Sequence, residues 1–176
     1  MTIAVVAVAG GSVAVAAPQR VNTKFDRKQP CKYVTAKQVQ KVFGGPVTVD
    51  PSNQGRNTFL ANACAFIVGT AAQPKGVLVV IKRYPYFEQP GQTAVDVLES
   101  SRATDSLAGV TVEDGKVGTA SYVNLDHSTL SVAPNKKFAF ALQWIAQGAP
   151  PDGGKLDAAT QKRLTTLAKL LAKAAR

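Results

Sequence analysis

The sequence predicts an α+β domain whose helices pack on a mostly antiparallel sheet. Helical and β-branched segments follow one another in the order helix, strands, helix, strands, helix. A turn-forming stretch at 133–137 joins two β segments, as in an antiparallel hairpin. The last segment, 156–174, is an amphipathic helix with leucines on one face and lysines on the other. These three observations favour a layered fold in which the C-terminal helix covers the sheet.

Residues 1–16 have the features of a secretory signal peptide. They carry no charged side chain, are rich in Val and Ala, and end with small residues at Ala14 and Ala16. We expect a flexible polar leader at 17–30 and a single α+β domain at 31–176. The apolar run is shorter than the about twenty residues of a membrane-spanning helix, and Cys31 lacks a lipoprotein cleavage motif. The sequence therefore predicts a secreted or cell-wall-associated protein without a transmembrane span.

Cys31 and Cys64 are the two cysteines of the chain. In an exported protein they favour one structural disulfide. Such a bond lowers the entropy of the unfolded chain and stabilises the fold by about 3.5–4 kcal/mol. The alternatives are two buried free thiols or a redox pair, although the Cys-x-x-Cys spacing typical of redox sites is absent. Two cysteines and one histidine are too few soft ligands for a metal, so we expect no metal or other cofactor.

The first helix of the domain begins after Thr35, a suitable N-cap. Val39 and Phe43 lie on one face, and Gly44 ends the helix. Strands are predicted at 47–49, 58–68 and 76–84. In the second strand Cys64, Phe66 and Val68 share a face by alternation. The third is continuously β-branched, as a central strand would be.

The second half of the domain contains a helix, several strands and the C-terminal helix. Thr93 caps a helix that extends to about 103. Strand character appears at 110–112, 120–123, 129–132 and 138–145, with a turn at 113–116. In the terminal helix, Leu164, Leu167 and Leu171 form an apolar face, which we expect to dock on the sheet.

The net charge of +10 and the pI near 9.8 favour anionic partners through long-range attraction. Outside a cell, such partners are envelope polymers or lipid headgroups. We do not expect specific recognition of nucleic acid, and we expect the protein to be a monomer. The candidate contact residues lie on the terminal helix and at a strand end: Lys155, Lys162, Lys169, Lys173, Arg176, Lys82 and Arg83. The alternative is a solvated basic surface that serves solubility alone.

Aromatic residues follow the basic pair at the end of the strand 76–84. Tyr84, Tyr86 and Phe87 are candidate ligand contacts, because interleaved aromatic and basic groups can stack on sugars or bases. The alternative is that these side chains are buried beneath the helix that follows.

The sequence contains no catalytic motif: Gly-x-Ser-x-Gly, a phosphate-binding glycine loop and His-Glu-x-x-His are absent. Asp126, His127 and Ser128 have the residue types of a triad, but consecutive positions cannot satisfy its geometry. We interpret His127 as a turn or strand-edge histidine. The preferred function is a secreted, non-enzymatic, envelope-associated binding or accessory protein.

Two alternatives remain open. One is an extracytoplasmic small-ligand carrier with a pocket between sheet and helices, lined by residues such as Phe140, Leu142 and Trp144. The other is a hydrolase whose site carries no recognisable motif.

Two cysteine-containing segments, CKYVTAKQVQKVFGG at 31–45 and ACAFIVG at 63–69, precede a hydrophobic strand. Pro30-Cys31 comes before a helix that ends at Gly44, and Phe66 follows Cys64. With the later hairpin and terminal helix, this pattern resembles an actinobacterial envelope family of unknown function, mostly small lipoproteins or secreted proteins. The resemblance covers about residues 30–175 and implies an α+β fold and a Cys31–Cys64 bond, but no catalytic residues. The chain differs by lacking a lipoprotein motif and by its basic charge.

Overall fold

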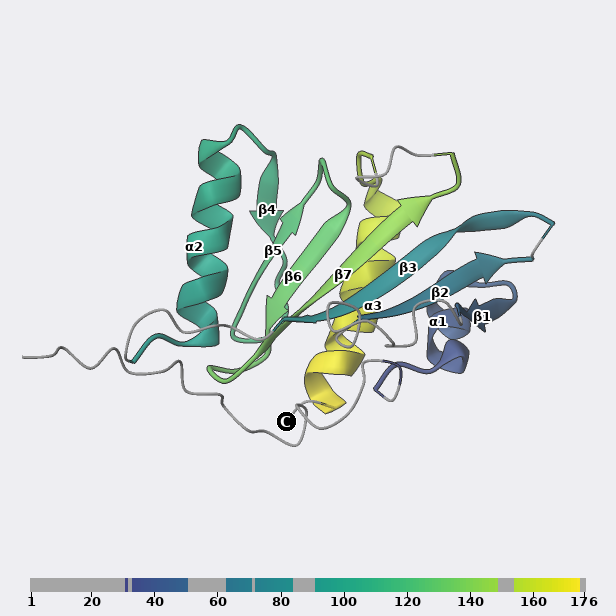
Figure 1. Ribbon diagram of the computed structural model, residues 1–176, viewed down its shortest axis with the longest axis horizontal. Coiled ribbons are helices and arrows are strands. Elements are labelled where there is room, and N and C mark those ends of the chain that lie inside the picture. Colours follow the sequence, from purple (N-terminus) through teal and green to yellow (C-terminus); the bar gives the residue numbers. More distant parts are fainter. Residues whose placement is uncertain are drawn as a thin grey trace, which may run out of the picture.

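A computed structural model describes residues 31, 33–50, 63–70, 72–83, 91–148 and 154–174, which form a seven-stranded sheet with helices on both faces (Figure 1). The predicted signal peptide and leader lie outside the described residues. So do residues 58–62 of the second predicted strand, and Tyr84, Tyr86, Phe87 and Arg176.

All neighbouring strands of the sheet pair antiparallel, in the order β1-β2-β3-β7-β6-β5-β4. The α+β prediction is therefore confirmed. β3 and β7 are far apart in the chain but adjacent at the centre of the sheet. The strands are β1 (Val47–Val49), β2 (Ala63–Gly69), β3 (Pro74–Arg83), β4 (Val112–Asp114), β5 (Ala120–Asn124), β6 (Thr129–Ala133) and β7 (Ala139–Ala146).

The helices are α1 (Ala36–Phe43), α2 (Ala94–Leu107) and α3 (Ala158–Ala174). α1 and α3 contact each other and cover one face of the sheet, and α2 covers part of the other face, over β4 to β7 (Figure 1). The alternation of strand residues explains the two layers. Val123 of β5 belongs to the core beneath α3, while its neighbour Tyr122 packs against α2.

The main core lies between the sheet and the pair α1 and α3. Leu164, Leu167 and Leu171 are at most 1% exposed, as the apolar face of the C-terminal helix predicts. Burial of each leucine contributes about 1.5–3 kcal/mol. On the strand side, the same cluster contains Phe140, Leu142 and Trp144 of β7. It also contains residues of β2 and β3, namely Cys64, Phe66, Val68, Leu78 and Val80.

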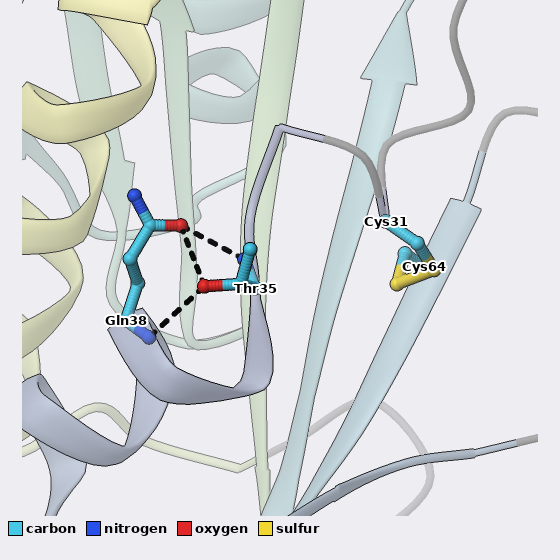
Figure 2. Close-up of a disulfide and its surroundings, with 4 residues drawn as sticks. All are labelled: Cys31, Thr35, Gln38 and Cys64. Atoms are coloured by element: carbon cyan, nitrogen blue, oxygen red, sulfur yellow. Dashed lines mark hydrogen bonds between the residues drawn. A yellow bond between two sulfur atoms is a disulfide. The ribbon is translucent and has the colours of Figure 1, made fainter.

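A disulfide joins the start of the domain to the sheet, as predicted. Cys31 lies just before α1, and its sulfur is bonded to that of Cys64 in β2, with the two Cα atoms 5.3 Å apart (Figure 2). The Thr35 N-cap is also confirmed. Its backbone N–H donates to Gln38 Oε1 at 2.8 Å, and the Gln38 N–H donates to Thr35 Oγ1 at 3.3 Å. This capping box satisfies two helix-terminal donors.

The bounds of several elements differ from the predictions, most clearly those of β4 and α2. The turn predicted at 113–116 is wrong in its first half, because Glu113 and Asp114 belong to β4 and pair with β5. β4 is an edge strand, and charged side chains are common on such edges, so its composition resembles that of a turn. The second helix extends four residues past the predicted end, to Leu107. Its last turn contains Thr104, Asp105 and Ser106, whose helix propensity is low.

Candidate functional site

The two helices on one face of the sheet carry only basic charges. α1 contributes Lys37 and Lys41, and neither α1 nor α3 contains an Asp or Glu. All of these basic side chains are exposed. We call this surface the basic helical face; its members are Lys37, Lys41, Lys162, Arg163, Lys169 and Lys173.

Helical periodicity directs the lysines of the basic helical face away from the sheet. Lys162, Lys169 and Lys173 recur at spacings of seven and four residues, opposite the buried stripe of Leu164 and Leu171. On α1, Lys37 and Lys41 are one turn apart and lie opposite the buried Val39. Because α1 and α3 contact each other, the two rows of cations lie on neighbouring helices of one layer.

The carboxylates of α2 lie on the other face of the sheet, but one carboxylate of β4 reaches α3, where Glu113 Oε2 accepts a hydrogen bond from Gln161 Nε2 at 3.0 Å. α2 carries Asp96, Glu99 and Asp105, on the opposite face of the sheet, and β4 carries Glu113 and Asp114 at its edge. Asp157 is the acidic residue closest in sequence to α3, where it accepts hydrogen bonds from Ala159 N–H at 2.9 Å and Thr160 N–H at 3.0 Å. It therefore acts as a cap at the start of the helix. Asp157 and Glu113 therefore place two carboxylates at the start of α3, while the helices of the basic helical face contain no Asp or Glu of their own.

Of the predicted basic contacts, the structure brings Lys162, Lys169 and Lys173 together and places exposed Lys155 just before α3. Lys82 and Arg83 are the last residues of β3, and their side chains lie outside the described part of the chain. The contribution of α1 was not predicted. Lys37 and Lys41 are visible in the sequence as an exposed pair, but the contact between α1 and α3 is not.

The opposite face of the sheet has a cavity of about 520 Å³ beneath α2. We call it the α2 pocket. It is lined by Ile81, Ser100, Ser101, Thr104, Asp105, Tyr122, Asn124, His127, Thr129, Ser131 and Gln143.

Two neighbouring rows of cross-strand pairs form the floor of the α2 pocket. Tyr122 pairs with Ser131, which in turn pairs with Ala141. In the next row, Asn124 pairs with Thr129, and Thr129 with Gln143. Residues two apart on a strand point to the same face, so both rows face α2.

The wall of the pocket is the second half of α2. Ala94, Leu98, Ser101 and Asp105 follow one another at spacings of four, three and four residues, which places them along one side of a helix. Ala94 and Leu98 pack on the sheet. Beyond them the same stripe becomes polar, so α2 closes tightly on the sheet at its start and leaves a polar cavity at its end.

Asp105 holds two polar side chains of the floor. Its Oδ2 accepts a hydrogen bond from the Tyr122 hydroxyl at 3.1 Å and another from Asn124 Nδ2 at 3.0 Å. Tyr122 and Asn124 are 3% and 5% exposed. Because unpaired buried polar groups are costly, these bonds make the polar floor compatible with a folded domain.

The Asn124 amide determines which nitrogen of His127 carries the hydrogen. Asn124 Oδ1 accepts from the backbone N–H of His127 at 2.9 Å, and Nδ2 donates to Asp105, which fixes the amide orientation. Nδ2 also lies 3.3 Å from His127 Nδ1. Nδ1 then accepts, so we assign the ring hydrogen to Nε2.

This tautomer is the reverse of that in a Ser-His-Asp triad, where Nδ1 donates to a carboxylate and Nε2 accepts from the nucleophile. With this assignment, His127 presents a hydrogen-bond donor at Nε2. His127 lies in an exposed turn, as predicted, but it also lines the α2 pocket, which the sequence interpretation missed. The missed signal was the run of polar residues at alternate positions, Tyr122, Asn124, Thr129 and Ser131.

The residues proposed from sequence as a pocket lining do not line the α2 pocket. Phe140, Leu142 and Trp144 belong to the core on the other face of the sheet. Trp144 stacks on Phe43 of α1, with ring centroids 5.0 Å apart. Alternation along β7 explains the difference, since Gln143 is the residue of this stretch that lines the pocket.

Among the described residues, no group of three or more His, Cys, Asp and Glu side chains is arranged to hold a metal ion. No helix within the described ranges has the length and apolar character needed to cross a bilayer. No protein-family model, curated protein or solved structure matches this chain. The resemblance to an actinobacterial envelope family stays a prediction.

Proposed function

We propose that this protein is a non-enzymatic, extracytoplasmic binding protein that adheres to anionic components of a cell envelope through the basic helical face. The observation that carries the proposal is that two adjacent helices present six cations and no carboxylate. Export is supported by the signal-like residues 1–16 and by the disulfide, which is typical of proteins outside the cytoplasm.

Electrostatics explain how such a surface binds without a deep site. A basic residue held near an anionic surface contributes about 1 kcal/mol, so several acting together give useful affinity although each is weak. Leu164, Leu167 and Leu171 of α3 are buried against the sheet and are not available for insertion into a bilayer, which leaves Leu170, 41% exposed, as the accessible leucine of this helix. Binding is therefore superficial and is expected to weaken steeply as salt screens the charges.

The test is co-sedimentation of the full chain with phosphatidylglycerol-containing vesicles, with pure phosphatidylcholine vesicles and with isolated cell walls. The triple variant Lys162→Gln, Lys169→Gln and Lys173→Gln is expected to lose most binding. A matched variant, Lys75→Gln, Lys136→Gln and Lys137→Gln, removes the same charge from exposed positions outside the helices and is expected to retain most of it.

Equal losses in both triple variants would show that net charge alone drives binding, and the proposed surface would be rejected. Binding to phosphatidylcholine vesicles that persists at high salt would also reject it. Retention on cell walls but not on anionic vesicles would assign the partner to wall polymers, and the reverse result would assign it to lipid headgroups.

A further inference from the structure

The α2 pocket lies on the face of the sheet opposite the basic helical face and plays no part in the function proposed above. Its volume of about 520 Å³ lies within the range of small-molecule sites. Its composition is unusual for the space beneath a helix. Ser131 and Asn124 are 1% and 5% exposed, whereas Leu130 and Val132, the residues on either side of Ser131, face the apolar core.

Three hydroxyl groups of the pocket, those of Ser101, Thr104 and Thr129, are arranged as acceptors. Ser101 Oγ donates to the Val97 carbonyl at 3.0 Å, and Thr104 Oγ1 donates to the Ser100 carbonyl at 3.0 Å. Thr129 Oγ1 likewise donates to the His127 carbonyl at 2.9 Å. A hydroxyl that has given its hydrogen to a carbonyl keeps lone pairs for a partner. A ligand that fits this lining must therefore be rich in hydrogen-bond donors.

The charges around the pocket determine which charge a ligand can carry. Asp105 contributes a carboxylate to the lining, and among the side chains that the structure describes no Lys or Arg lines the pocket. Its Oδ2 is engaged by Tyr122 and Asn124, and Asp105 as a whole carries negative charge into the cavity wall. An anionic ligand would be repelled there, and an ammonium group would be attracted.

We propose that the α2 pocket binds a small polyhydroxylated ligand of sugar size that is neutral or carries an amine, and that it excludes anionic sugars. Hydroxyl groups of the ligand donate to Ser101, Thr104 and Thr129, and an amine lies near Asp105. The Nε2 hydrogen of His127, at the turn that borders the pocket, is available to a ligand oxygen.

The test is a titration of the full chain with glucosamine, glucose and glucuronate, followed by amide chemical shifts in NMR spectra. Glucosamine and glucose are expected to change the amide chemical shifts of the residues of α2, β5 and β6 that line the pocket. Glucuronate, which has the same ring and a carboxylate, is expected to leave them unchanged. Absence of shifts with all three probes, or a preference for glucuronate, would overturn the proposal.

Two variants locate the site. Thr104→Trp fills the cavity from the exposed side of its wall and is expected to abolish the shifts, whereas Ala103→Trp, next to it on α2 but outside the lining, is expected to preserve them. Asp105→Asn is expected to weaken the binding of glucosamine about tenfold, because a charged hydrogen bond is lost. The same variant is expected to weaken the binding of glucose less. Equal binding by the Thr104→Trp and wild-type proteins would place the sugar elsewhere. Vesicle binding is unaffected in every case, so this test and that of the basic helical face fail separately.

Discussion

Leu167 and Leu170 lie three residues apart on α3, and only Leu167 is buried, at 1% exposure against 41% for Leu170. The pair separates the contribution of core packing from that of helix propensity. Both residues are leucines in the middle of one helix, so their intrinsic preferences for the helix are the same. Any difference between their substitutions reports the docking of α3 on the sheet.

Leu167→Ala is expected to lower the free energy of unfolding by about 2–5 kcal/mol, because it leaves a cavity in the core. Leu170→Ala is expected to change it by no more than about 0.5 kcal/mol, as is usual for surface positions. Urea unfolding followed by circular dichroism measures both. Similar values for the two variants would contradict the docking of α3 by its leucine stripe.

Removal of the disulfide is expected to destabilise the domain. The double variant Cys31→Ala, Cys64→Ala frees the chain between these residues in the unfolded state. The gain in chain entropy is expected to lower the free energy of unfolding by about 3.5–4 kcal/mol. Reductant is expected to lower the urea midpoint of the wild-type protein to that of the variant and to leave the variant unchanged. A wild-type midpoint that does not respond to complete reduction would contradict a stabilising role for the bond.

The cap of α3 gives stability that depends on pH. The Thr160 hydroxyl, which donates to Asp157 at 2.6 Å, and the backbone N–H groups of Thr160 and Ala159 hold the pKa of Asp157 below its ordinary value of 3.8. A carboxyl whose pKa is lower in the folded state stabilises the fold above its unfolded pKa, and this stabilisation disappears as the pH falls through the folded pKa.

Asp157→Ala is therefore expected to lower the free energy of unfolding by about 1 kcal/mol at neutral pH. This loss is expected to become smaller in acid. Asp157→Asn is the matched control, since Asn also caps helices but does not titrate. The stability difference between the Asn and Ala variants is expected to stay constant as the pH falls, while that between wild type and Ala decreases. A wild-type-to-Ala difference that is independent of pH would show that the charge of Asp157 contributes nothing.

Features encoded over a few neighbouring residues could be predicted from the sequence. The Thr35 cap, the leucine face of α3 and the hairpin between β6 and β7 each depend on a local pattern. The boundary of β4 could not, because Glu113 and Asp114 become strand residues only by pairing with Tyr122 and Val123. Strand pairing at a charged edge leaves no local signal.

The α2 pocket depends on contacts between distant parts of the chain. Asp105 reaches Asn124 across 19 positions, and Gln143 of β7 joins the floor only because β6 pairs with β7 in this register. Sequence reasoning placed a pocket beside Phe140 and Trp144 because it could identify their face as apolar, but not that α1 and α3 fill it. The same limit applies to the basic helical face, where Lys37 joins the α3 lysines through packing of the two helices.

The sulfur–sulfur link between Cys31 and Cys64 closes the intervening backbone into a covalent ring that contains all of α1 and β1. A single backbone cut inside this ring does not divide the molecule, because both pieces stay tethered through sulfur. Such a nicked chain keeps its full mass under denaturing conditions and separates into two fragments only after reduction. Under attack by a protease, the ring would therefore keep Lys37 and Lys41 attached to the domain after a single cut within it.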